Sequence, residues 1–175
     1  VATGLQVVWA MAFAPDGRLF FTERPGRIRA MVDGQLLPDP VATLPAASTS
    51  ESGLMGLALD PEFATNGYLY VDYTYRTGAG GLQNRVSRLT VNGNQAGDET
   101  VLLDGIPASN IHDGGRVRFG PAGKLFVTAG DASNQPSAQD LGALSGKILR
   151  LNPDGTIPDD NPFPGSPVYS YGHRN

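Results

Sequence analysis

The chain has 175 residues, of which 40% are apolar, so it is long enough for one domain with a sizeable core. A formal net charge of -4 without any basic cluster argues against a nucleic-acid partner, since phosphate binding needs Lys and Arg gathered on one face. Cysteine is absent, which excludes a disulfide framework, a thiolate metal site and a thiol nucleophile. No stretch is long and apolar enough to cross a bilayer, so we expect no membrane insertion.

The chain begins with Val1, and its first residues contain neither Met nor a basic leader before an apolar run. We interpret this start as a mature or trimmed N-terminus from which a secretion signal has been removed. The lack of cysteine also favours an exported or a thermally stressed protein over an ordinary cytosolic one. These features predict a periplasmic or secreted protein.

Three segments repeat one pattern: an apolar residue, Pro, an acidic or small residue, a turn glycine and then an alternating strand. They are residues 13–22, 59–71 and 119–128. Proline presets φ for a turn and glycine closes it, while the residues that follow alternate between a core face and a wet face. Each repeat is therefore predicted to be a hairpin.

Further short strands are predicted at 27–32, 85–91, 100–103 and 147–151. Four strands per repeat, at spacings of this size, are typical of propeller blades. A β-sandwich would also supply strands and turns, but it gives no reason for the recurring Pro-x-Gly hairpin. We therefore expect an all-β fold, a β-propeller in which residues 1–175 form a single domain of about three four-stranded antiparallel blades.

An Asp-rich loop at 152–160 invites a calcium site. Asp154, Asp159 and Asp160 lack the alternate-position ligands and closing Glu of an EF-hand loop. Residues 152–158 are instead predicted to form a hairpin turn.

Both histidines of the chain lie in glycine-bounded segments, 110–116 and 171–175. Histidine titrates near neutral pH, so His112 can accept a proton and pass it on. Arg116 and Arg174 provide cations that can hold a carboxylate or a developing oxyanion. The alternative is that His112 is a hydrogen-bonded structural residue or plain surface.

Six motifs occur in the order found in the glucose/sorbosone dehydrogenase family, which the chain resembles over essentially its whole length. They are residues 9–13, 22–26, 53–57, 112–116, 146–155 and 172–175. Members of this family are soluble aldose sugar dehydrogenases that depend on pyrroloquinoline quinone (PQQ) and are built as six-bladed propellers. The resemblance therefore implies an oxidoreductase that acts on a small sugar and passes electrons to an external acceptor.

The resemblance also implies roles for individual residues. His112 takes the place of the base that removes the proton from the anomeric hydroxyl as hydride leaves C1 for the quinone. Arg174 matches the arginine that binds the quinone carbonyl oxygens, where it would have a catalytic role by stabilising the negative charge that develops during hydride transfer. Asn175 matches a cofactor-binding asparagine beside it. We expect His173 to support the loop that presents Arg174.

Two positions depart from the soluble glucose dehydrogenases. Glu51, in a position expected to face sugar, stands where they carry an amide, and Ile111 stands where they carry a carboxylate. Both changes alter hydrogen bonding to the sugar. A broader aldose specificity than glucose alone is therefore expected.

The chain covers about half of the ring that the family resemblance implies, its N-terminal half. The calcium ligands and further cofactor-binding basic residues are expected beyond residue 175, and no metal site is expected within the chain. The chain is then a fragment, one piece of a nicked enzyme, or a half-propeller that pairs with another copy. We expect its open flanks to associate with a second propeller half or with the chain itself.

Two other functions remain open at this point. One is a non-catalytic propeller that serves as a binding module, and the other is a metal-dependent sugar lactonase. A binding module has no need of both His112 and the Arg174–Asn175 pair, and a lactonase needs carboxylate and amide ligands that converge on a metal.

Overall fold

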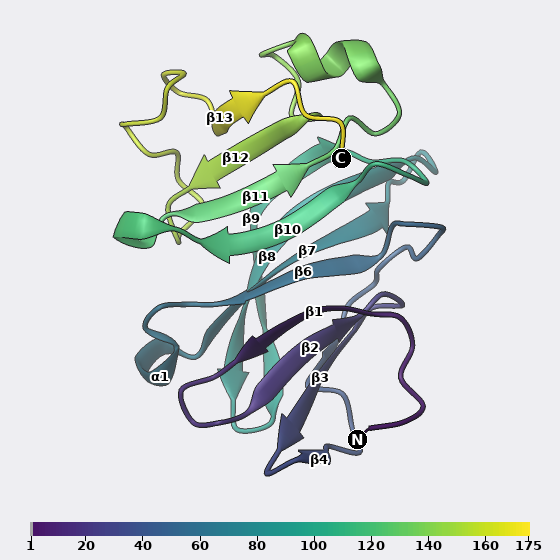
Figure 1. Cartoon of the computed structure of the whole chain (residues 1–175), viewed down its shortest axis with the longest axis vertical. Helices are drawn as coiled ribbons and strands as arrows, with labels where there is room; N and C mark the ends of the chain where they lie inside the picture. Colours follow the sequence, from purple (N-terminus) through teal and green to yellow (C-terminus); the bar gives the residue numbers. More distant parts are fainter. Residues whose placement is uncertain (1) are drawn as a thin grey trace.

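A computed structural model describes residues 2–175, so Val1, the first residue of the expected trimmed N-terminus, lies outside the described residues. The fold consists of three antiparallel sheets stacked in chain order (Figure 1). The first sheet contains β1 (Val8–Phe13), β2 (Leu19–Glu23), β3 (Arg27–Val32) and β4 (Gln35–Leu36), with the short β5 (Ala42–Thr43) also paired to β3.

The second and third sheets contain four strands each, and every strand pairs with its neighbour in the chain. The second comprises β6 (Leu54–Leu59), β7 (Tyr68–Arg76), β8 (Leu82–Asn92) and β9 (Gln95–Pro107), and the third comprises β10 (Gly114–Phe119), β11 (Leu125–Ala129), β12 (Lys147–Leu151) and β13 (Val168–Tyr171). The helical pieces are α1 (Phe63–Asn66) and two 3₁₀ turns, Pro121–Gly123 and Gln135–Gln139. The prediction of a propeller with three antiparallel blades and no helix beyond short turns is confirmed.

Each repeated Pro-x-Gly segment forms the hairpin between the first and second strands of a sheet. In the first sheet the Ala14 N–H donates to the Arg18 carbonyl at 2.8 Å, and the Gly17 N–H donates to the Ala14 carbonyl at 3.0 Å. Gly17 has φ +88°, a conformation that favours glycine. The predicted hairpins are thus correct, and they fix the pairing register of each blade.

One predicted turn needs a correction. Residues 152–156 do form a turn, closed by the Asn152 N–H donating to the Thr156 carbonyl at 2.8 Å. The next strand does not follow directly, however, because β13 begins only at Val168. The turn is part of a long connection and is not a hairpin.

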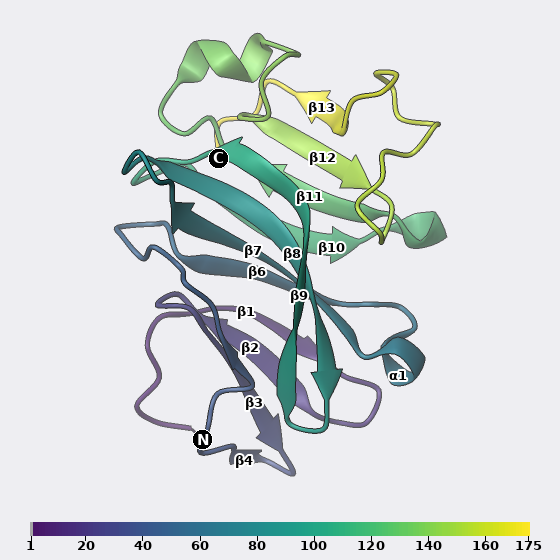
Figure 2. The ribbon, with the colours of Figure 1, turned by 180° about the vertical axis from the view of Figure 1, so that it is seen from behind.

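Two hydrophobic cores lie between the three sheets, and the middle sheet is buried on both faces. Leu69 of β7 packs in the core against the first sheet, whereas its neighbour Tyr70 packs in the core against the third. Side chains alternate across a strand, so adjacent residues of one strand serve two cores. Seen from behind, the turn between β8 and β9 reaches down beside the first sheet (Figure 2), where the Ala96 N–H donates to the Val41 carbonyl at 2.8 Å.

The first strands of the sheets lie side by side, since β6 contacts both β1 and β10. Gly56 of β6 and Gly115 of β10 make this approach possible: a Cβ atom on Gly56 would lie 2.1 Å from the Gly115 carbonyl oxygen. Only the absence of side chains lets the two backbones come this close. The segments that precede β6 and β10 are thereby brought together at one edge of the stack.

The free flank of the first sheet carries apolar side chains. Met11 and Phe13 of β1 are 55% and 74% exposed. Exposure of two large apolar side chains on one strand is unusual for a surface that stays in contact with water.

Candidate active site

A pocket of about 200 Å³ opens at the edge where the first strands begin. Seven residues line it: Trp9, Arg24, Glu51, Met55, Asp113, Gly114 and Asn175. Two of the predicted site residues, Glu51 and Asn175, therefore share one pocket although they come from distant parts of the chain.

His112 does not itself line this pocket but directly precedes the lining residues Asp113 and Gly114, and its backbone has an unusual conformation. Its φ is +62°, in the left-handed region that few residues other than glycine adopt. The carboxylate of Glu51 accepts the His112 N–H at 2.8 Å, and the His112 carbonyl accepts the Ala132 N–H at 3.1 Å. Gly130 lies against the same carbonyl, so two neighbouring segments hold His112 in this conformation.

The imidazole of His112 is held by Asp131. Its Nδ1 lies 2.9 Å from Oδ1 of Asp131, a carboxylate that is almost fully buried and that also accepts the Ser133 N–H at 2.9 Å. A carboxylate can only accept from a ring N–H, so this contact assigns the proton of the neutral ring to Nδ1. Nε2 then carries the lone pair and is available as a base.

The C-terminal residues attach to the His112 and Asp131 loops. Asn175 Oδ1 accepts the Gly114 N–H at 3.1 Å, and the Arg174 carbonyl accepts the Asp131 N–H at 2.8 Å. The exposed guanidinium of Arg174 forms no hydrogen bond within residues 2–175 and borders a second hollow of about 150 Å³ that Asp131 also lines. Arg174 thus lies beside the 200 Å³ pocket and does not line it.

His173 has a local role. Its Nε2 lies 2.8 Å from Ser170 Oγ, and its backbone N–H donates to the Gly146 carbonyl at 3.1 Å. Both contacts tie the C-terminal segment to the third sheet. The geometry agrees with the expectation that His173 supports the segment that carries Arg174.

Sequence reasoning missed Asp131 and Arg24. Asp131 follows Gly130 just after the end of β11. A carboxylate directly after a predicted strand was the sequence signal that could have marked it as a site residue. Arg24 lines the 200 Å³ pocket, and its Nε is buried without a hydrogen-bond partner among residues 2–175. Nothing in the Pro-Gly turn that follows Arg24 indicates a pocket position.

Arg116, the other cation noted in the sequence, lies over the Trp9 ring, with its guanidinium carbon 4.2 Å from the ring centre. Burial, together with the charge of Arg118, lowers the pKa of Arg116. The stacked pair joins β1 to β10 and fixes the Trp9 wall of the pocket.

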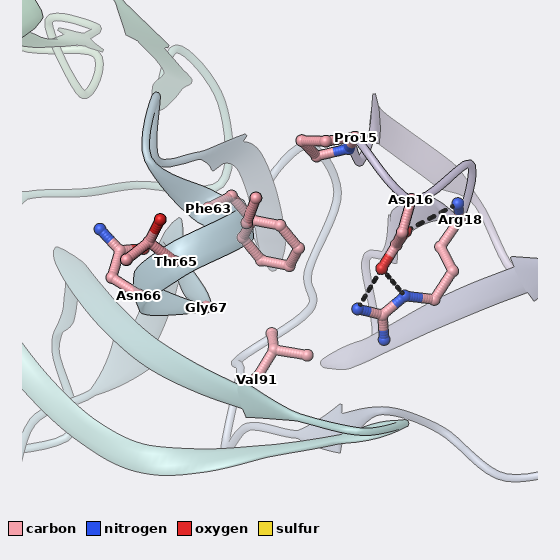
Figure 3. A pocket seen from close by; sticks show the side chains of 9 residues that line it. Pro15, Asp16, Arg18, Phe63, Thr65, Asn66, Gly67 and Val91 are labelled. Atoms are coloured by element: carbon pink, nitrogen blue, oxygen red, sulfur yellow. Dashed lines mark hydrogen bonds and ion pairs between the residues drawn. The ribbon is translucent and has the colours of Figure 1, made fainter.

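A larger hollow of about 310 Å³ lies at the opposite edge of the sheets, among the hairpin turns (Figure 3). Its charged residues are already paired: Arg18 binds Asp16 at 2.8 Å and also reaches the Gly93 carbonyl. It contains none of the predicted site residues. Within residues 2–175, no group of three or more His, Asp and Glu side chains is arranged to hold a metal ion.

Known proteins resemble this chain over its full extent. The sequence pattern of the glucose/sorbosone dehydrogenase family matches residues 5–175. The aldose sugar dehydrogenase YliI of Escherichia coli is 33% identical over 178 residues, which are 95% of this chain and 48% of that protein.

Two solved structures show the same architecture. An oxidoreductase of Thermus thermophilus, described as a glucose dehydrogenase, superimposes with a TM-score of 0.92 at 47% identity and is matched over 100% of this chain and 54% of its own. The PQQ-bound aldose sugar dehydrogenase of Streptomyces coelicolor has a TM-score of 0.89 at 38% identity, with 100% and 53% covered. The chain spans about half the length of these relatives, and it belongs to the glucose/sorbosone dehydrogenase family.

Proposed function

We propose that the protein carrying this chain oxidises the C1 hydroxyl of aldose sugars to the lactone, with hydride transfer to PQQ. The observation that carries the proposal is the His112–Asp131 pair, which lies next to the pocket residues Asp113 and Gly114 in the chain and in which Nδ1 is hydrogen-bonded and Nε2 is left as an acceptor. A base of this kind is what removal of a hydroxyl proton requires. Family membership supplies the class of reaction.

In this proposal His112 accepts the proton of the anomeric hydroxyl at Nε2. Asp131 keeps the ring in the correct orientation and tautomer, and its negative charge stabilises the imidazolium that forms. Loss of the proton raises the electron density on the sugar oxygen and so favours departure of hydride from C1. Asp131 is itself held by the Ser133 N–H, so the pair is oriented before the sugar arrives.

The chain's own residues suit an anionic quinone. PQQ carries carboxylates. Arg24 brings to the pocket a buried Nε that has no hydrogen-bond partner among residues 2–175, and Asn175 brings an amide. Arg174 is close by with an exposed guanidinium. When bound, PQQ would supply the two-electron acceptor that no amino-acid side chain provides. The Streptomyces coelicolor relative was solved in a PQQ-bound form, which further supports the assignment.

The pocket formed by this chain is only part of the proposed site. Its volume of about 200 Å³ falls below the roughly 300–1,000 Å³ of typical small-molecule sites. The remaining wall, and any calcium ligands, would come from the part of the family fold that this chain does not span. Among residues 2–175, no group of three or more His, Asp and Glu side chains is placed to hold calcium.

Glu51 is proposed to contact the sugar. One of its oxygens is engaged by the His112 N–H, which leaves the second oxygen for a sugar hydroxyl. A carboxylate accepts but does not donate, unlike the amide expected in glucose-selective relatives. We therefore propose a broad range of aldoses as substrates.

Further expectations concern the setting of the enzyme. In residues 2–175 no helix has the length and apolar character needed to traverse a membrane. We propose a periplasmic or secreted location, reduction of an external electron acceptor, and cover for the exposed flank of Met11 and Phe13 by a second propeller half or another copy. In this proposal residues 1–175 form a single domain, which is the N-terminal half of the propeller.

Reconstitution tests the proposal. The full-length protein is mixed with PQQ, a panel of aldoses and an artificial electron acceptor, and we expect acceptor reduction that requires both sugar and quinone. Hydrolysis of sugar lactones without quinone would instead identify a lactonase. Sugar binding without either reaction would identify a binding module.

A further inference from the structure

Three aspartates, Asp72, Asp113 and the His112 partner Asp131, each have one buried carboxyl oxygen without a hydrogen-bond partner among residues 2–175. Asp72, in the middle of β7, is 1% exposed, and Asp113 is 2% exposed. Within residues 2–175, Oδ1 of Asp72 and Oδ2 of Asp113 are both buried without a partner, whereas the other oxygen of Asp113 accepts the Ser109 N–H at 2.8 Å. Buried oxygens are normally paired, so these unpaired oxygens require an explanation, and the charge of Asp113 acts on Asp72.

The two carboxyl groups belong to the same interface between the second and third sheets. Asp72 and Thr74 share one face of β7, and Thr74 pairs with Asn84 of β8. The Asn84 side-chain amide donates to the Asp113 carbonyl at 3.2 Å. Asp72 is therefore one same-face step, roughly 6.6 Å, along β7 from Thr74, whose cross-strand partner Asn84 contacts the Asp113 backbone.

We propose that Asp72 is a positioning residue for His112: it remains a neutral carboxylic acid and donates its proton to the free oxygen of Asp113. One shared proton then ties the loop that carries His112 to the second sheet. No covalent bond is made or broken, and the proton stays between the two oxygens. The positioning part of this inference rests on the proposed role of His112, whereas the shared proton does not.

The electrostatics agree with this geometry. Burial, and next the charge of Asp113, raise the pKa of Asp72 well above its usual range. Burial raises the pKa of Asp113 to about 6. The hydrogen bond from the Ser109 N–H works against this rise, the charge of Glu51 adds to it, and the charge of His112 works against it.

The charged neighbours leave the pair without a counter-ion. The charge of Glu51 raises the pKa of Asp113 and that of His112 lowers it. Arg24 lines the same pocket as Asp113, but among the described residues it forms no ion pair with either carboxyl group. Two buried carboxylates without a cation would repel each other, and one proton removes that repulsion.

A metal ion is the alternative occupant for two orphan oxygens. A metal needs more ligands than this, and residues 2–175 contain no group of three or more His, Asp and Glu side chains placed to hold one. A proton needs only the two oxygens present.

The sign of the pH dependence follows from the raised pKa values. The folded protein keeps a proton that the unfolded chain has released above the ordinary Asp pKa of 3.8. The pair's contribution to the free energy of unfolding is therefore complete below that value and is lost as the pH rises through the raised folded pKa values. Asp72→Asn gives Asp113 a permanent N–H donor and should remove this loss.

Infrared spectroscopy of the full-length protein tests the shared proton directly. At pH 7 we expect the carbonyl stretch of a protonated carboxylic acid, which Asp72→Asn abolishes. Asp60→Asn is the matched control, because Asp60 is buried on the same sheet but its two oxygens accept from Tyr70 Oη and the Glu62 N–H, each at 2.9 Å. That variant should leave the band in place. A wild-type spectrum without the band, or a band that survives Asp72→Asn, overturns the shared proton.

Turnover tests the positioning role. Asp72→Asn should lose less than about threefold in kcat, whereas Asp72→Leu, which cannot donate, should lose roughly tenfold because the His112 loop is no longer fixed. Equal kcat values and equal pH profiles for the two variants would refute positioning. A wild-type protein with the acid band but no dehydrogenase activity would refute the proposed function and leave the shared proton standing.

Discussion

The two edges of the stacked sheets differ in how far apart their interacting residues lie in the chain. At the hairpin edge, Asp60, Asn66 and Asp16 each accept a backbone N–H from a residue two positions further on. At the site edge, Glu51 contacts a residue 61 positions away, and His112 contacts Asp131 19 positions away.

The difference teaches that one repeated unit can serve two purposes. Local hydrogen bonds close each hairpin and set its register, and the contact of Arg18 with the Gly93 carbonyl is a long-range addition to them. The site edge depends on the sheets being stacked, because its residues meet only when the blades pack. Variants at the site edge should therefore change turnover, and variants at the hairpin edge should change stability.

Replacement of His112 should produce the largest effect. His112→Gln removes the base and should lower kcat for an aldose by about 10²- to 10⁴-fold in the reconstituted full-length enzyme. Circular dichroism and quinone titration should remain close to wild type. His173→Gln is the control, and it should change quinone affinity more than kcat. If His112→Gln kept near-normal kcat and His173→Gln lost it, the roles assigned to the two histidines would be the wrong way round.

A methyl group at Gly130 should be the next most harmful change. The new Cβ would lie 1.9 Å from the His112 carbonyl oxygen, so the His112 loop must move. A shift of about 1 Å at a reacting group can cost about 10²-fold in kcat. Gly97→Ala, where no atom lies within 4 Å of the added Cβ, should leave kcat unchanged. Equal kcat values for the two variants would show that the His112 backbone does not need this support.

Glu51 should have a smaller effect. Glu51→Ala removes the acceptor of the His112 N–H and should lower kcat about tenfold, since a hydrogen bond to a charged group contributes about 1.5–3 kcal/mol and this one is partly exposed to water. Glu51→Gln retains an acceptor oxygen and should recover most of that loss while shifting KM among aldoses. A Glu51→Ala enzyme with wild-type kcat would contradict the role of this contact.

The smallest change is expected at the hairpin edge. Asn66→Ala removes the acceptor of the Tyr68 N–H and should lower the free energy of unfolding by about 0.5–1.5 kcal/mol, with kcat unchanged. Chemical denaturation and steady-state kinetics measure the two quantities. A fall in kcat per folded molecule would show that the two edges are coupled.

The same contrast explains what could be predicted from sequence. The hairpins at 13–22 and 119–128 were predictable because Pro and Gly act within a few residues of their own positions. His112 stood out by its glycine neighbours. Asp131 and Arg24 did not, because their importance arises from partners that only the packed sheets bring near. The buried Asp72 likewise reads as a polar residue in a strand, and only the pairing of the nearby Thr74 with Asn84, which contacts Asp113, indicates its surroundings.

The central claim is that Asp131 holds the Nδ1 proton of His112 so that Nε2 is free to act as a base. Nitrogen-15 NMR of histidine-labelled full-length protein measures this directly, because protonated and unprotonated ring nitrogens have well-separated chemical shifts. For neutral His112 we predict a protonated Nδ1 and an unprotonated Nε2, with the preference weakened in Asp131→Asn. A neutral His112 with its proton on Nε2 in the wild-type protein would contradict the account.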